Sequence, residues 1–440
     1  MQKIFNRRLI PALMAVAFAG SASAAGFQLL EQNASGLGNA YAGSAAVADN
    51  ASTIYFNPAG MTQLQTREVS VGGAIVGTSF DFKNNGSSVG TLAGSGNGSD
   101  GGTTGFIPNA YMSWALSKDL YIGLGLGAPF GLKTEYDDDW VGAAHSISFD
   151  IKTINLNPSI AWRANDWLSL GFGVSWQRVE AEYVRKVATG VVGVPAFNVF
   201  PASKVKLSLD DDSWGWNAGA LFKLAPQTRL GISYRSTIKY ETEGDIKTTG
   251  PSAGLNAVGS VDAKAEIKMP DTFIVSLAHG INDRVELLGD VSWTGWSSIP
   301  KVDIVRASGA ASGTVAQVLD TDFRDTWRFA VGANYKVDDA LKLKFGLAYD
   351  QTPVQDAEHR LTSLPDNNRT WFSAGAQWKL NKTTALDVGA AYLYVKDAEI
   401  DNDQSQTAMT AAAQAANRGT VKGTYDNSAW LLGAQFSMAF

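Results

Sequence analysis

The stretch LSLGFGVSWQ, residues 168–177, alternates large apolar side chains with small or polar ones at every step. Successive side chains of a β-strand point to opposite faces, so this period of two predicts a strand with one apolar face. The same period recurs at 327–335 and at 341–350. Such strands occur both in soluble sandwiches and in membrane barrels, and the pattern therefore predicts an all-β fold without choosing between them.

The links between the strands make that choice. Fourteen candidate strands are joined by tight turns, as at 164–166, that alternate strictly with long links of about 13–23 residues, as at 129–147, 186–204 and 300–321. An even number of strands, with short turns at one end and long loops at the other, is typical of outer-membrane barrels. We therefore predict a fourteen-stranded antiparallel transmembrane β-barrel over residues 68–440.

Both ends of the chain favour export to an outer membrane. Residues 1–24 have a basic start, an apolar run at 9–20 and small residues at 22–24, which together predict a cleaved signal peptide. The last strand presents alternating apolar residues and ends in Phe440, like the terminal strands by which the barrel assembly machinery recognises its clients. We expect that machinery and outer-membrane lipid, including lipopolysaccharide, as partners in a Gram-negative bacterium.

The composition argues against several other classes of protein. A formal net charge of −6 does not favour nucleic acid, and the absence of cysteine excludes disulfides. The three histidines, His145, His279 and His359, have no metal-ligand spacing, and no catalytic constellation is visible. The acidic clusters at 137–139 and 210–212 are interpreted as solvated faces near loop ends. We predict no enzyme activity, no cofactor and no metal site.

Residues 25–67 fit neither the signal peptide nor the barrel. They are rich in glycine, alanine, serine and asparagine and contain only short apolar runs. A barrel that passes water-soluble solutes needs no such segment, whereas compact chain of this length ahead of the first strand would fill a lumen. We predict that residues 25–67 form a plug, or hatch.

Two irregularities interrupt the barrel pattern. The link Val187–Pro201 (VATGVVGVPAFNVFP) is strongly apolar, which predicts contact with a hydrophobic molecule or, alternatively, self-packing against 129–147. Pro129 stands where the alternation of the third strand fails, and proline is confined to strand ends, edges and bulges. That strand either bends out of register or simply ends before a loop.

Short motifs follow one another along the mature chain: AGFQ at 25–28, SGLG at 35–38, NPA at 57–59, GWNAG at 215–219 and SLPDNNR at 363–369. In order and spacing they resemble the FadL family of outer-membrane channels for long-chain fatty acids and other hydrophobic molecules. The resemblance covers essentially the whole mature chain and implies a hatch-plugged, fourteen-stranded barrel.

The resemblance also implies a ligand route. Ligand would enter an apolar groove between the links 129–147 and 186–204 and pass to a deeper pocket reached by Phe27, where Arg185 would take a carboxylate. A second basic residue of the fatty-acid pocket is not matched, because Leu319 occupies the aligned position. The apolar residues expected in the groove are Val191, Val192, Val194, Phe197 and Phe200.

Exit is expected through the side of the barrel, at a kink in the third strand toward which the NPA loop of the hatch points. A fatty chain gains roughly 0.8 kcal/mol per buried methylene, so exit into the bilayer preserves what release into water would forfeit. The expected gate comprises Asn57, Pro58 and Ala59 of the hatch and Pro129, Phe130 and Gly131 of the wall.

These patterns predict passive, gated uptake of long-chain fatty acids or similar amphiphiles. Aromatic or alkane hydrocarbons are the alternative cargo for the same route. Two alternatives of other classes are an aqueous porin and a barrel whose loops serve as an adhesin or phage receptor.

Overall fold

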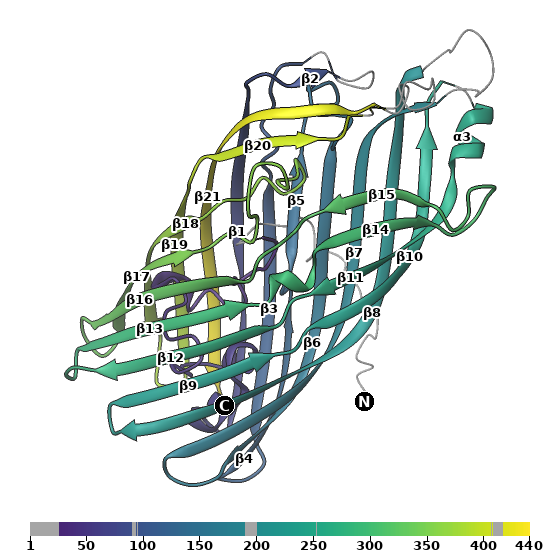
Figure 1. Cartoon of the computed structure of the whole chain (residues 1–440). Coiled ribbons are helices and arrows are strands. Elements are labelled where there is room, and N and C mark those ends of the chain that lie inside the picture. Colours follow the sequence, from purple (N-terminus) through teal and green to yellow (C-terminus); the bar gives the residue numbers. More distant parts are fainter. Residues whose placement is uncertain are drawn as a thin grey trace, which may run out of the picture.

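One antiparallel sheet closes into a barrel around a folded N-terminal segment, which is purple in Figure 1. This computed structural model describes residues 26–89, 94, 96–189, 200–251, 253–405, 407 and 417–440. The predicted signal peptide at 1–24 lies outside the described residues.

Fourteen spans form the wall over the described residues, as the sequence predicts. The undivided spans are β1 (Arg67–Asn84), β3 (Thr104–Ala115), β6 (Ser148–Arg163), β7 (Leu168–Thr189), β8 (Phe200–Ala225), β17 (Leu341–Asp350), β18 (Arg369–Lys379) and β21 (Gly419–Ala439). The divided spans are β4 (Leu120–Gly127) with β5 (Gly131–Glu135), β9 (Thr228–Arg235) with β10 (Ile238–Thr249), β11 (Val261–Met269) with β12 (Thr272–Gly280), β13 (Val285–Thr294) with β14 (Lys301–Arg306), β15 (Val315–Asp320) with β16 (Thr326–Lys336), and β19 (Thr384–Val395) with β20 (Ala398–Asp403).

Short elements complete the chain. The N-terminal segment contains η1 (Leu37–Asn39), α2 (Thr53–Phe56) and η2 (Pro58–Gln63), and the loops carry β2 (Ser88–Val89), α3 (Ala253–Gly259) and η3 (Trp296–Ser298). No helix in the described part of the chain has the length and apolar character needed to cross a bilayer.

The first and last spans close the ring. β1 and β21 pair continuously from Glu68 opposite Ala439 to Asn84 opposite Gly423. Closure matters because hydrocarbon offers no hydrogen bonds to a free strand edge, and a sheet in a bilayer must satisfy its own backbone groups.

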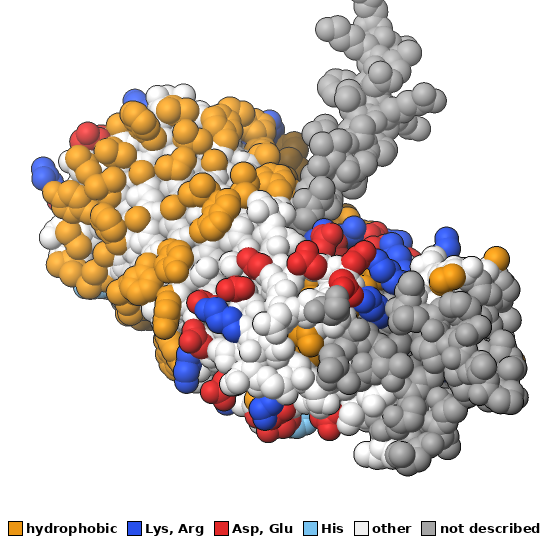
Figure 2. Space-filling view, turned by 90° about the horizontal axis from the view of Figure 1, so that it is seen from above, with side chains coloured by type: hydrophobic (Ala, Val, Ile, Leu, Met, Phe, Trp, Pro, Cys, Tyr) orange, Lys and Arg blue, Asp and Glu red, His pale blue; other side chains and the backbone are white. Residues whose placement is uncertain are grey.

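The outward face of the wall changes character along the spans. Large apolar side chains such as Phe172 and Trp216 are exposed on β7 and β8, whereas Arg178 and Asp210 further along the same strands form an ion pair of 2.6 Å. Figure 2 shows the apolar side chains gathered over one part of the surface and the charged ones over another. The apolar band marks the part of the wall that faces hydrocarbon.

One predicted link is wrong. Most of 300–321 is not a loop but the hairpin of β14 and β15, which lengthens the wall on its long-loop side. These strands lie beyond the apolar band, and Lys301 and Asp303 form an ion pair of 2.8 Å there. Charged residues therefore interrupt the apolar outward face that was used to find the spans.

The closing seam predicts a specific cross-link. The hydroxyl oxygens of Ser70 and Ser437 are 3.0 Å apart on directly opposed residues of β1 and β21. Because the native chain has no cysteine, the double variant Ser70→Cys/Ser437→Cys should form one disulfide on mild oxidation of the folded protein. After boiling without reductant it should migrate faster on SDS gels than its reduced form.

The matched control is Ser70→Cys/Ser428→Cys, because Ser428 pairs with Ser79 and not with Ser70. The control should not cross-link. Equal cross-linking of both variants would contradict this seam.

Candidate functional site

The N-terminal segment, residues 26–66, lies inside the ring of strands and is called the hatch below. Glycines of the wall let its backbone approach closely. A Cβ at Gly231 of β9 would lie 2.0 Å from the Ala45 carbonyl oxygen, and one at Gly346 of β17 would lie 2.1 Å from the Asn39 carbonyl carbon. At these two positions the hatch fits against the wall only because the wall residue has no side chain.

Polar bonds also hold the hatch. The Lys344 ammonium of β17 donates to the Ser35 carbonyl oxygen at 2.8 Å and pairs with Asp387 of β19 at 2.8 Å. Asp49 of the hatch lies 3.1 Å from Lys342. Burial alone would raise the pKa of the Asp49 carboxyl, but Lys342, Lys344 and Arg229 together outweigh it and lower that pKa to about 2. Asp49 is therefore a charged anchor at neutral pH.

The third span along the chain, which consists of β4 and β5, is broken beside the hatch. β4 ends at Gly127 and β5 begins at Gly131, and these four steps face only three on β6, from Asn155 to Lys152. This extra residue is a bulge, as Pro129 allows. The span resumes beyond Pro129, so the sequence-based reading of a strand that bends out of register is right and that of a plain strand end is wrong.

The break leaves a window between the second and third spans. β3 pairs with β4 up to Ala110 opposite Leu126, whereas no ladder pair among the described residues joins β3 to β5. Beyond the window, at the long-loop end of β5, the Glu135 backbone amide donates to the Gly101 carbonyl oxygen at 3.0 Å. The window is therefore framed by hydrogen bonds at both ends.

The hatch supplies hydrogen bonds that the wall lacks at the break. The Leu29 amide donates to the Pro129 carbonyl oxygen at 2.7 Å, and the Gly131 amide donates to the Phe27 carbonyl oxygen at 2.8 Å. Gln28 thereby forms an antiparallel bridge with Phe130. Residues 27–29 act as a short strand that seals the window from inside.

An apolar cavity lies against the same residues. Its volume is about 80 Å³, several times the roughly 10–15 Å³ that one water requires. The Phe27 ring lines this cavity and packs against Trp296 and Phe130, with ring centroids 4.8 and 5.9 Å away. Phe27 therefore belongs to the cavity and to the seal at once. Other apolar side chains that line the cavity include Ile151, Leu207, Leu209, Ile267, Ile304, Leu319 and Phe323.

Arg185 stands at the outer end of this cavity rather than in its lining. On β7 it follows Tyr183, which does line the cavity, on the same face, and its Nε donates to the Gln317 side-chain oxygen at 2.8 Å. Leu319, where a second base is expected by resemblance, lines the cavity with apolar surface. The Arg185 guanidinium thus lies at the end of a cavity whose lining is largely apolar.

The first link of the predicted groove packs on itself. Tyr136 stacks on Trp140 with ring centroids 4.2 Å apart, and Trp140 is fully buried. Burial lowers the pKa of His145 in the same link to about 4, so this imidazole is neutral at physiological pH. On the other link, Val191, Val192, Val194 and Phe197 lie outside the described residues, as does the side chain of Phe200.

The NPA loop does not point at the break. The Asn57 side-chain amide donates to the carbonyl oxygens of Ala220 on β8 and Ala45 of the hatch, at 2.9 and 2.8 Å. A Cβ at Gly171 of β7 would lie 2.2 Å from the Ala59 nitrogen. The expectation that Asn57, Pro58 and Ala59 face the kink is therefore wrong, because these bonds and the space at Gly171 fix the loop against β7 and β8.

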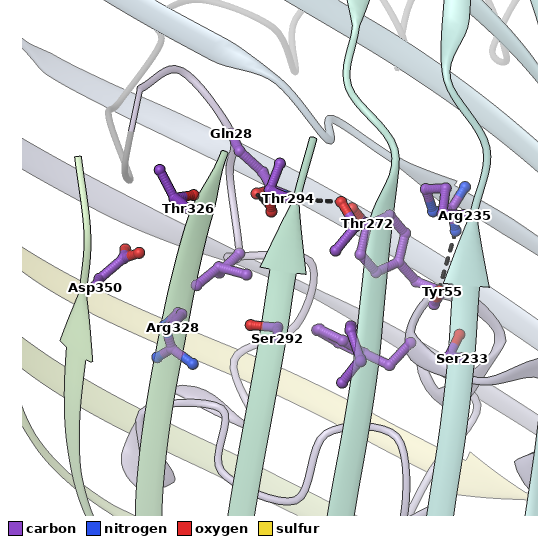
Figure 3. A pocket seen from close by; sticks show the side chains of 13 residues that line it. Gln28, Tyr55, Ser233, Arg235, Thr272, Ser292, Thr294, Thr326, Arg328 and Asp350 are labelled. Atoms are coloured by element: carbon purple, nitrogen blue, oxygen red, sulfur yellow. Dashed lines mark hydrogen bonds between the residues drawn. The ribbon is translucent and has the colours of Figure 1, made fainter. Parts of the chain in front are cut away.

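Gln28 also lines a second chamber, which is more polar than the apolar cavity and is called the polar chamber below (Figure 3). Its lining includes Arg235 and Arg328 of the wall. The Gln28 side-chain amide nitrogen donates to Thr272 Oγ1 at 3.1 Å, and Thr294 Oγ1 donates to Gln28 Oε1 at 3.2 Å. Phe27 thus lines the apolar cavity and Gln28 the polar chamber, and the sequence offered no local signal for this role of Gln28.

Burial also acts on a carboxyl within the hatch. It raises the pKa of Glu31 to about 7, although Arg369 and Arg328 act in the opposite direction. Glu31 therefore adds less negative charge to the lumen at neutral pH than a solvated carboxylate would.

Known proteins share this architecture. Residues 15–440 match the family described as outer membrane protein transport protein (OMPP1/FadL/TodX), a family of transporters rather than enzymes. Outer membrane protein P1 of Haemophilus influenzae is 32% identical over 423 residues, which cover 89% of this chain and 90% of that protein. The long-chain fatty acid transport protein of Escherichia coli K12 is 28% identical over 446 residues, 94% of each chain.

Solved structures agree on the fold. A Pseudomonas aeruginosa FadL homologue superposes with a TM-score of 0.82 at 22% identity, covering 94% of this chain and 99% of that one. The Pseudomonas putida toluene transporter TodX superposes with a TM-score of 0.69 at 17% identity, with the same coverage.

The close contact at Gly231 predicts how the hatch can be displaced. A valine there would place its Cβ 2.0 Å from the Ala45 carbonyl oxygen, so the hatch must shift while the barrel still closes. Gly231→Val should raise the steady conductance of the purified protein in planar bilayers several-fold. Gly289→Val on β13 is the matched control, because a Cβ there meets nothing within 4 Å.

Both variants should keep the heat-dependent gel migration of a folded barrel. A folded Gly231→Val protein with the conductance of the wild type would contradict the account of the hatch as the element that blocks the lumen.

Proposed function

Because this chain belongs to the OMPP1/FadL/TodX family of outer membrane transport proteins, we propose that it carries hydrophobic molecules passively across that membrane. The family, its outer-membrane relatives and the closed barrel place the protein in the outer membrane of a Gram-negative bacterium. The observation that carries the proposal is the double position of Phe27, which lines the apolar cavity and belongs to the strand that seals the window.

The proposed route begins in the apolar cavity and ends in the bilayer. A ligand that fills the cavity competes with the Phe27 ring for the same apolar surface. Displacing Phe27 would break its bond with the Gly131 amide and loosen the seal at Pro129. The freed ligand would then meet an opening in the wall.

The contents of the lumen favour that exit over a path straight through the barrel. The chamber beyond Gln28 is lined by guanidinium and hydroxyl groups beside apolar ones such as Phe56 and Ile274, so it is more polar than the apolar cavity. An alkyl chain loses roughly 0.8 kcal/mol per methylene on moving from apolar surface to water, so the polar chamber opposes its passage. The window leads from the apolar cavity to the border of the outward apolar band, where Phe106 and Leu124 are exposed.

Long-chain fatty acids are the cargo we propose first. The E. coli relative is named for them, and Arg185 at the outer end of the cavity is suited to a carboxylate. Aromatic or alkane hydrocarbons are the second candidate, supported by Leu319 in the cavity lining where a second base would be expected.

Replacing Arg185 separates the two candidates. If its guanidinium binds a carboxylate, Arg185→Met should weaken oleate binding to the purified protein by about tenfold, the order of one hydrogen bond to a charged group. Binding of hexadecane, which has no headgroup, should change less than twofold. The assay is equilibrium competition against radiolabelled oleate, with toluene as a third competitor.

The matched control is Arg178→Met on the same strand, because Arg178 faces outward and pairs with Asp210. It should change neither affinity. Equal losses for oleate and hexadecane in Arg185→Met would mean that Arg185 does not bind a carboxylate.

A further inference from the structure

We infer that Pro108 prevents β3 from pairing with the third span at the window. Proline lacks the backbone amide that would donate across this gap. The inference rests on the proposed function, in which the window is the exit, and it assigns the opening to the second span as well as to the break at Pro129.

The register of β3 fixes where its backbone groups point. In an antiparallel pair, hydrogen-bonded and non-hydrogen-bonded residue pairs alternate. The Leu116 amide donates to the Leu120 carbonyl oxygen at 2.8 Å, so even-numbered residues of β3 are the ones that bond to β4. Beyond Ala110 opposite Leu126, the next such bond would join residue 108 to Ala128.

The other edge of β3 gives the same answer independently. The Thr78 amide donates to the Thr103 carbonyl oxygen at 2.9 Å, in line with the pairing of β1 and β3. Odd-numbered residues on this side therefore bond to β1. Residue 108 directs its backbone groups away from β1 and into the window.

Proline has no amide hydrogen, so Pro108 cannot bond the Ala128 carbonyl oxygen. The hatch does so instead, because the Gln32 side-chain amide donates to that oxygen at 2.7 Å. In the sealed state the carbonyl is thus satisfied by an element that belongs to the plug. When the hatch shifts, β3 has no donor with which to take its place.

A second proline shows that a missing donor alone does not open the wall. Pro158 interrupts the pairing of β6 and β7, where the Val174 carbonyl oxygen accepts from the Asn157 side chain at 2.9 Å. The ladder resumes at once, with Leu156 and Ser159 both paired to β7. No bulge adjoins Pro158, whereas Pro108 lies opposite the bulge at Pro129.

The test compares Pro108→Ala with Pro158→Ala in the full mature chain. Hydrogen exchange should show one additional slowly exchanging amide in the peptide 106–110 of Pro108→Ala, since the new donor reaches the Ala128 oxygen. Oleate uptake by cells should fall about fivefold, the factor that one net backbone hydrogen bond confers on an equilibrium. Oleate affinity of the purified protein should stay within twofold of wild type.

Pro158→Ala restores a donor in a closed part of the wall and should leave uptake unchanged. A rapidly exchanging amide at residue 108, or unchanged uptake in Pro108→Ala, would overturn the inference. Equal losses of uptake in the two variants would overturn it as well. If wild-type cells took up neither oleate nor toluene, the proposed function would fail, while the exchange result would still decide whether Pro108 withholds a ladder bond.

Discussion

The structure depends on one constraint: in hydrocarbon, each backbone amide and carbonyl must find its hydrogen bond within the protein. The closed ladder from β1 to β21 meets this demand nearly everywhere, and the break in the third span does not. There the hatch supplies the missing groups through Phe27, Leu29 and Gln32. Plug and wall are therefore one hydrogen-bonded unit, and in the proposed route moving the plug and opening the wall are a single event.

The distribution of polarity in the lumen gives that event a direction. Phe27 lines the apolar cavity, and the next residue, Gln28, lines the polar chamber. In the proposed route, a hydrophobic ligand in the cavity acts on the window before it can act on the chamber, since Phe27 shares its backbone with the seal. That proposed route needs no energy source, because it takes the ligand from an apolar cavity toward the apolar band of the wall.

The sequence predicts the barrel well, because strict alternation and the regular order of short and long links are direct consequences of a lipid-facing wall. It also marks Pro129 as an irregularity of the third span, although it leaves a bend out of register and a plain strand end as alternatives. It fails at 300–321, where strands beyond the apolar band carry charges outward. It fails again at Asn57 and Gln32, whose partners Ala220 and Ala128 are distant in the chain, so that no local pattern records them.

The most direct test fixes the seal in place. Gln28 and Phe130 form an antiparallel bridge flanked by the two backbone bonds of the seal, a geometry in which paired cysteines can form a disulfide. In a chain with no other cysteine, oxidised Gln28→Cys/Phe130→Cys should lose oleate uptake and recover it on reduction, relative to the two single variants. Full uptake by the completely cross-linked protein would contradict the claim that residues 27–29 must leave the window for transport.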